Sequence, residues 1–141
     1  MAEFNLEQAT FAALCFVAGK DNKISSDELK EINKVFDDLG YFSLNKSDKD
    51  YIYGLWESNL KNGDAFLKLV TDSLAPCSKL DQMKAFKHIS LFLNRISKGL
   101  ISSLTHASVK RADRWPAANE LLSKLTFTPE EYDEYITEVI E

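Results

Sequence analysis

The most informative part of the sequence lies at residues 18–29 and reads AGKDNKISSDEL. A helix is expected to end at Gly19, and a short polar turn follows it before the apolar Ile24. Ser25 and Glu28 form an S-x-x-E pattern, which is typical of the capping box at the start of a helix. The stretch therefore predicts two helices joined by a short turn, the second beginning after Ser25.

The same turn has some features of a calcium-binding loop. An EF-hand loop carries acids at its first, third and fifth positions and a bidentate Glu at its twelfth. With Glu28 at the twelfth position, Val17 and Gly19 fall at the first and third, and neither supplies a side-chain oxygen. A working EF-hand is therefore not expected. Asp21 and Glu28 are the candidate ligands of a weakly bound divalent cation, and no other cofactor is predicted.

Outward from this turn, every long segment shows the apolar spacing of a helix, and none alternates cleanly with period two. Helices are predicted at about 6–18, after 25 up to Gly40, from 45–47 to 62–63, around 66–74, from Ser78 to the region of Gly99, around 121–125, and from Thr128 onward. Thr128, Pro129 and Glu131 provide an N-cap, a first helical residue and a capping box for the last helix. The sequence predicts a single all-α domain over residues 1–141, a bundle of about seven helices.

Several residues that could carry chemistry have a structural explanation. Cys15 is expected to be a small buried hydrophobe. His88, on the long helix, is expected at the surface or at the edge of the core rather than as a ligand. The acids of the second helix, Glu31 among them, alternate with Lys30 and Lys34 and are interpreted as a solvated face with i,i+4 pairs. The inward stripe of the third helix is expected to contain Ile52, Leu55, Trp56 and Leu60.

Composition excludes several classes of protein. Of the 141 residues, 45% are apolar and 28% are charged, as in an average globular protein. The longest apolar run, Phe11 to Ala18, is far shorter than the roughly 20 residues that cross a bilayer, so no membrane span is expected. The N-terminus lacks the basic region of a secretory signal, and a cytoplasmic location is predicted. Phosphate loops, H-E-x-x-H and C-x-x-C are absent from the sequence, so an enzyme is not predicted.

Charge is distributed unevenly along the chain, whose formal net charge is −5. Seven bases and one acid between Lys84 and Arg114 give +6, and six acids without a base between Thr128 and Glu141 give −6. One interpretation is that these two segments pair with each other. The other is that the basic segment is a partner surface, and then Lys98, Lys110, Arg111 and Arg114 are the candidate contact residues.

Two patches of the sequence resemble the TerB-like (tellurite-resistance protein B) family of helical domains. Residues 18–28 resemble that family's pattern of two small residues, Asp-Gly-x-Ile/Val-Ser-x-x-Glu, with Asn22 where Gly is usual. Asn is the residue that best replaces Gly at positive φ. Residues 122–132 resemble the family's closing pattern, in which Thr/Ser-Pro-Glu-Glu-aromatic follows a helix. The resemblance implies an all-helical fold and a degenerate internal duplication, in which residues 21–26 correspond to 98–103.

The resemblance also implies a non-enzymatic interaction module, linked to tellurite or other chemical stress, that acts by contact with another protein. In the second copy of the duplication, Lys98 stands where the family has Asp, which leaves half of any acidic ligand set. The alternative function is an anion-binding module that uses residues 95–114 on nucleic acid or phospholipid. The sequence pI near 5.1 and the lack of interleaved aromatic residues disfavour nucleic acid. The partner's identity and the oligomeric state stay open.

Overall fold

The computed structural model of the chain describes residues 4–19, 23–99 and 117–140, and these residues form helices and no strand. The prediction of an all-α fold is therefore confirmed for the described part of the chain. The helices are α1 (Leu6–Ala18), α2 (Ser26–Leu39), α3 (Lys46–Ser58), α4 (Gly63–Leu74), α5 (Lys79–Gly99) and α7 (Pro129–Ile140), with a further helical segment at 117–123. The predicted starts of α2 and of α7 agree with these bounds.

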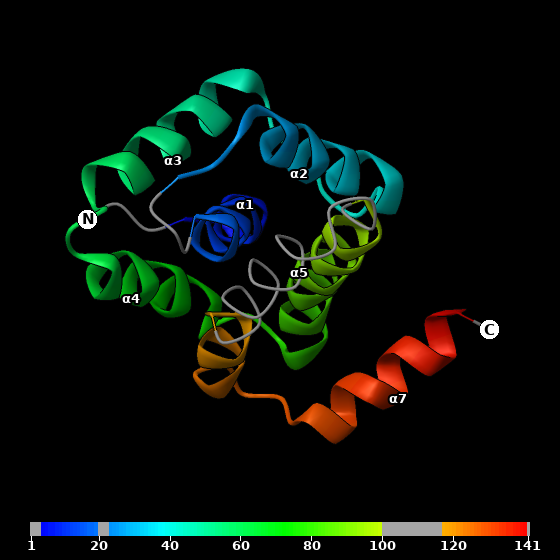
Figure 1. Ribbon diagram of the computed structural model, residues 1–141. Coiled ribbons are helices and arrows are strands. Elements are labelled where there is room, and N and C mark those ends of the chain that lie inside the picture. The colour runs from blue at the N-terminus through cyan, green and yellow to red at the C-terminus, as the bar shows by residue number, and fades with distance from the viewer. Residues whose placement is uncertain (1–3, 20–22, 100–116, 141) are drawn as a thin grey trace.

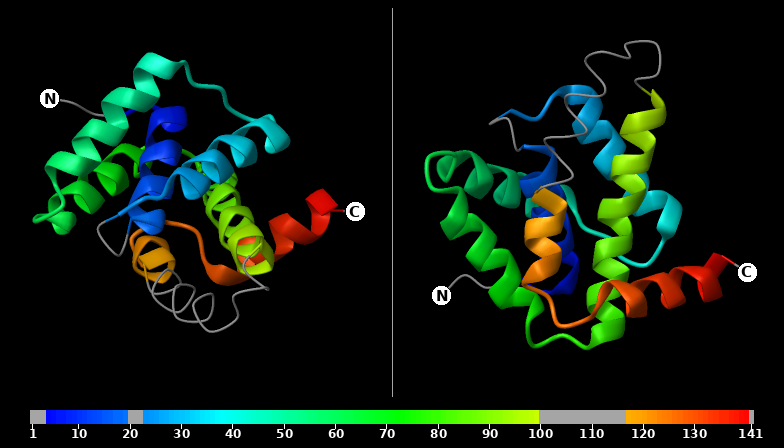
Figure 2. Two further views of the ribbon diagram at one scale, coloured as in Figure 1. Left: turned by 45° about the horizontal axis from the view of Figure 1, so that its top comes forward. Right: turned by 60° about the horizontal axis from the view of Figure 1, so that its bottom comes forward.

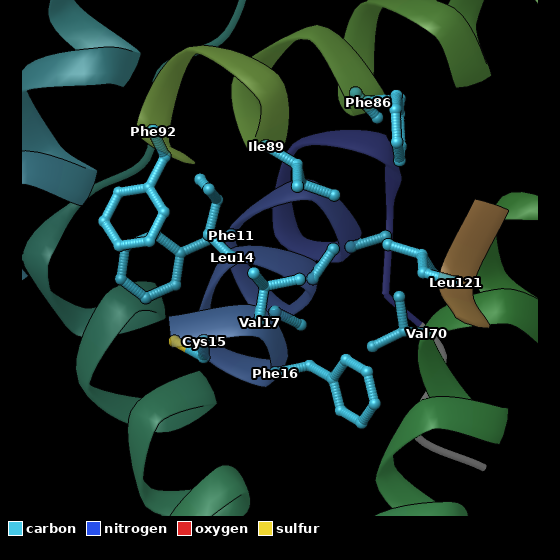
Figure 3. Packing of buried hydrophobic residues seen from close by; sticks show 14 of the residues in the cluster. Phe11, Leu14, Cys15, Phe16, Val17, Val70, Phe86, Ile89, Phe92 and Leu121 are labelled. Carbon is cyan, nitrogen blue, oxygen red and sulfur yellow. The ribbon is translucent and has the colours of Figure 1, made fainter. Parts of the chain in front are cut away.

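Helix α1 lies at the centre of the molecule. Helices α2, α3, α4 and α5 and the segment 117–123 surround it (Figure 1), and α1 packs against each of those four helices. Every residue of α1 from Ala9 to Ala18 is buried. A helix without a polar face is stable only when neighbouring helices cover it on all sides. The apolar run at 11–18 is thus the core of the domain, and its side chains meet Val70, Ile89 and Leu121 from the surrounding elements (Figure 3).

Short polar motifs fix where the helices begin. The Ser25 hydroxyl accepts a hydrogen bond from the backbone N–H of Glu28 at 3.1 Å, and the Glu28 carboxylate accepts the Ser25 N–H at 2.8 Å. Asn5 and Asn45 are the N-caps of α1 and α3, and the side-chain oxygen of each accepts a backbone N–H at 2.8 Å. Gly40 ends α2 in the left-handed region at φ 68°, where a residue without Cβ is least strained. The sequence-level caps at Ser25 and Gly40 are confirmed.

A close approach of α3 to the end of α1 depends on Gly19. A Cβ atom at this position would overlap the indole ring of Trp56, a buried residue of α3. Gly19 has an ordinary negative φ of −92°, so its requirement is steric rather than conformational. Leu60, expected on the inward stripe of the third helix, is instead exposed because α3 already ends at Ser58.

The C-terminal helix α7 lies outside the ring of helices around α1 and packs on α5 (Figure 2). The Tyr132 hydroxyl donates to Ser90 Oγ at 3.0 Å, and Lys79 Nζ lies 3.2 Å from Glu131 Oε2. Thr128 and Glu131 form the predicted capping box, with hydrogen bonds of 3.1 and 2.8 Å. None of the described helices combines the length and apolar character needed to cross a bilayer.

Candidate functional site

The turn that suggested a cation site is organised as a helix cap. Glu28 is buried, and its Oε1 accepts the backbone N–H of Ser25. Asp21, the other candidate ligand, lies outside the described residues. Among the residues that the structure describes, no three His, Cys, Asp or Glu side chains come together as a metal-binding group. The Glu28 carboxylate is therefore already engaged in a capping box.

The basic segment is partly neutralised within the fold. Arg95 on α5 lies 3.3 Å from Glu31 Oε2 and 2.6 Å from Asp38 Oδ2, both on α2. The interpretation that Glu31 belongs to i,i+4 pairs on a solvated face is therefore wrong, because α2 packs against α5 and this side of α2 meets a base. Lys98 belongs to the last turn of α5, and its side chain lies outside the described residues, as do Lys110, Arg111 and Arg114.

His88 is a core residue rather than one at the surface or the core edge, which corrects the expectation from the sequence. Its side chain is fully buried, and the ring of Phe42 stacks on it at 5.2 Å with an interplanar angle of 8°. Phe36 and Tyr41 approach it at centroid distances of 4.9 and 6.0 Å. The segment after α2 therefore covers α5 at this point, a long-range contact that helical periodicity does not report.

Of the two ring nitrogens of His88, one has a hydrogen-bond partner in the described structure and the other has none. Nδ1 lies 2.8 Å from the carbonyl oxygen of Lys84, which requires that this nitrogen carries the proton. Nε2 is buried and has no hydrogen-bond partner in the described structure. Burial of the ring, reinforced by the nearby Lys87 ammonium, lowers the pKa of His88 to about 4, although the hydrogen bond to Lys84 opposes this shift. His88 is thus a neutral imidazole at physiological pH.

Above His88, two lysines surround the ring of Tyr41. Lys87 Nζ donates to the Tyr41 hydroxyl at 3.1 Å, and this hydrogen bond lowers the pKa of Tyr41. Lys84 Nζ and Lys87 Nζ lie 5.8 and 5.4 Å from the centre of the Tyr41 ring, within the range of a cation–π contact. Lys87 also lies 5.9 Å from the ring of Tyr135 on α7. Two lysines of α5 thus contact Tyr41, whose ring lies beside the buried His88.

A groove with an apolar floor lies between α2 and α3. Its volume is about 650 Å³, within the range of ligand-binding clefts. The groove is lined by Phe11, Leu29, Asn33, Lys46, Lys49, Asp50 and Tyr53. Phe11, from the central helix, is almost fully buried, and Leu29 and Tyr53 are half-buried. The groove therefore offers apolar surface below a charged rim.

Asn33 lines this groove and carries an unsatisfied acceptor. Its Nδ2 donates to the carbonyl oxygen of Leu29 at 3.1 Å, whereas its Oδ1 is buried without a hydrogen-bond partner in the described residues. Sequence reasoning did not single out Asn33, because an Asn beside the apolar stripe of α2 looks like an ordinary surface residue. The signal in the sequence is its i+4 spacing from Leu29, which places both side chains on one side of the helix.

The rim of the groove comes from the first turns of α3. Lys46 Nζ forms an i,i+4 salt bridge with Asp50 at 2.9 Å, and both side chains are largely exposed. Lys49 is half-buried and makes no salt bridge to any residue that the structure describes. The three charges on this rim therefore sum to +1.

The chain matches no protein-family model, no curated protein sequence and no solved structure.

A second hollow of comparable size, about 670 Å³, lies beside α4 and is lined by Asp64, Leu67, Lys68, Thr71, Asp72, Glu120 and Lys124. Lys68 and Asp72 pair with each other at 2.7 Å, and the residues lining this hollow contain no buried atom without a partner. The groove between α2 and α3 is distinguished from it by the Asn33 acceptor. This groove is the candidate functional site.

Proposed function

We propose that this protein is a non-enzymatic interaction module that holds a segment of another polypeptide in the groove between α2 and α3. The observation that carries the proposal is the buried, unpartnered Oδ1 of Asn33 on the wall of a groove with an apolar floor. A buried acceptor without a donor costs about 1–3 kcal/mol. When the Asn33 side chain turns toward the groove, a backbone N–H of a bound segment supplies that donor and removes the cost.

The shape of the groove suits one or two apolar side chains next to that hydrogen bond. Leu29 and Tyr53 form half-buried walls, and Phe11 forms the base. Tyr53 packs against Trp56 with ring centroids 5.5 Å apart, and Trp56 is buried against the end of α1. The wall on α3 is thus anchored in the core, so that a ligand meets a preformed surface and binding orders few side chains.

We further propose that this module is TerB-like and that it acts in the cytoplasm in the response to tellurite or other chemical stress. Its support is the resemblance of residues 18–28 and 122–132 to that family's patterns, together with a helix cap at Ser25 and Glu28 of the kind those patterns describe. Cation binding by Asp21 and Glu28 is proposed to be weak, because the Glu28 carboxylate already accepts a backbone N–H. Submicromolar calcium affinity in calorimetry would contradict a degenerate loop.

The alternative function, anion binding by residues 95–114, is less well supported. Its first base, Arg95, forms salt bridges with Glu31 and Asp38 on α2. Recruiting its guanidinium to a phosphate would leave both carboxylates without that partner. The groove needs no such exchange, because Asn33 Oδ1 has no partner to lose among the described residues.

The proposal is tested by selecting binders from a phage library of random dodecapeptides on the immobilised protein. We expect enriched peptides that bind the wild type and lose most of their affinity for Asn33→Leu, which removes the acceptor while keeping a side chain of similar size. Leu80→Ser, at an exposed position on α5, is the matched control and retains binding. Selection that yields no enriched peptide, or peptides that bind Asn33→Leu as well as the wild type, overturns the proposed function.

A further inference from the structure

Resting on this proposed function, we infer that the segment held in the groove is acidic and that Lys49 pairs with one of its carboxylates. Lys49 and Asn33 line the same groove from α3 and α2. The Lys49 side chain is half-buried, and no carboxylate of the described structure lies within salt-bridge distance of it. An acidic side chain of the partner would reach an ammonium group that the fold leaves without a counter-ion.

The position of this charge within α3 supports the inference. Lys46 is the first residue of α3 and Lys49 the fourth, so both bases lie at the end of the helix where the backbone dipole is positive. Helices ordinarily favour acids there and disfavour bases. The same turn contains the acid Asp48, but this residue is not part of the groove lining, whereas Lys46 and Lys49 are. An anionic ligand is the complement of the positive charge that these two lysines place at the rim.

Asp50 is the acidic residue on the same rim, and its salt bridge does not close the site. Lys46 and Asp50 have side chains that are 89% and 65% exposed. An exposed i,i+4 pair of this kind is weak and exchanges readily with solvent. It also leaves Lys49 untouched. A partner carboxylate therefore has access to Lys49 without displacing an internal ion pair that the structure shows.

The peptide selection described above also tests this inference, through the composition of the enriched pool. We expect peptides that combine an apolar residue with net negative charge, and an affinity that falls between about 50 and 500 mM NaCl because exposed ion pairs are screened. A parallel selection on Lys49→Glu is expected to reverse the charge preference toward basic peptides. For one acidic peptide from the wild-type pool, Lys49→Glu should weaken binding at least about tenfold and Lys49→Gln about fivefold.

Lys61→Glu is the matched control, because Lys61 is exposed and lies outside the groove. It changes the net charge of the protein by the same amount and should alter affinity less than about twofold. Enriched peptides that need Asn33 but are neutral or basic, or that bind Lys49→Glu as well as the wild type, overturn the acidic partner and leave the proposed function standing. An equal loss with Lys61→Glu and Lys49→Glu shows a general charge effect and also overturns the inference.

Discussion

Asn33 and His88 each bury one polar atom that has no hydrogen-bond partner in the described structure, yet their surroundings differ. The Asn33 side chain is part of the lining of a groove of about 650 Å³, although its Oδ1 is itself buried. His88 Nε2 lies in a ring that is fully buried and stacked against Phe42, with Phe36 and Tyr41 beside it. The first side chain belongs to the lining of a groove, and the second is packed among aromatic side chains.

A buried polar atom without a hydrogen-bond partner therefore does not by itself identify a binding site. At His88 the missing partner is expected to lower the stability of the fold and to make it sensitive to acid, because the ring is buried among Phe36, Tyr41 and Phe42. At Asn33 the same kind of cost is reversible, because a partner's N–H can remove it. The two sites share α2, which carries Asn33 toward the groove and Phe36 toward His88. They are nevertheless expected to respond differently to mutation and to pH.

The largest expected effect is a loss of stability and of groove binding that leaves His88 unchanged. Gly19→Ala places a Cβ inside the indole ring of Trp56, which forces α3 away from α1 and should cost about 3 kcal/mol of unfolding free energy. Peptide binding in the groove should weaken with it, whereas the pKa of His88 should not change. Urea denaturation and an NMR titration of the imidazole measure the two effects.

Gly54→Ala is the control for this substitution, because a Cβ at Gly54 on α3 meets nothing within 4 Å. Replacing a helical glycine by alanine at such a position should raise stability by up to about 1 kcal/mol. Equal effects of Gly19→Ala and Gly54→Ala would show that the contact between Gly19 and Trp56 does not hold α3 in place.

The next effect concerns acid sensitivity at His88. Its pKa is about 4 in the folded protein and 6.5 in the unfolded chain, so below pH 6.5 the unfolded state binds a proton that the folded state does not. This contribution to stability is fully present above pH 6.5 and decreases as the pH falls toward 4. Linkage predicts a loss of about 2 kcal/mol between pH 7.5 and pH 5.

Urea denaturation of the wild type and of His88→Phe at both pH values isolates this contribution, since the carboxylates are common to the two proteins. His88→Phe also removes the unpartnered nitrogen and should be more stable at pH 7.5 by about 1 kcal/mol. The same loss between pH 7.5 and pH 5 in both proteins would show that His88 is not the acid-sensitive group.

A smaller effect is expected at the start of α2, the helix that both sites share. Ser25→Ala removes the hydroxyl that accepts a hydrogen bond from the Glu28 N–H. It should lower the free energy of unfolding by about 1 kcal/mol. Ser26→Ala, one position later and exposed, should change it by only a few tenths. A calorimetric comparison of the two variants measures this difference, and the opposite ranking would place the cap at Ser26.

The smallest expected effect is on the stability of the groove itself. Asn33→Leu removes a buried acceptor and its hydrogen bond to Leu29, and the two changes oppose each other. The free energy of unfolding should therefore stay within about 1 kcal/mol of the wild type, with an increase favoured. A loss well above this value in urea denaturation would mean that Asn33 is a structural residue.

Helical periodicity and capping patterns predicted much of this fold. The bounds of α1 and the starts of α2 and α7 follow from apolar spacing and from Ser25 and Pro129, because these signals act within a few residues of the chain. The burial of Cys15 was also predictable, since α1 has no polar face. Burial raises the pKa of this thiol, as expected of a core cysteine.

The long-range contacts could not be predicted from apolar spacing and capping patterns. The salt bridges of Arg95 to α2 and the stacking of Phe42 on His88 join residues that are far apart in the sequence. The i+4 spacing from Leu29 places Asn33 on one side of α2 with the apolar stripe, but its role in the groove depends on the positions of α1 and α3. The candidate site could therefore be identified only from the packed helices, whereas the helix caps could be predicted from the sequence.

The proposal to be tested is that a ligand in the groove contacts the side chain of Asn33 and leaves the buried ring of His88 unaffected. It is tested most directly by following both side chains in one NMR titration of the isotope-labelled protein with an acidic peptide from the selection. We predict that the side-chain amide signals of Asn33 move and saturate with the peptide, while the imidazole signals of His88 stay in place. Saturable binding that leaves the amide signals of Asn33 in place, or that shifts the imidazole signals of His88 instead, would show that the groove is not the binding site.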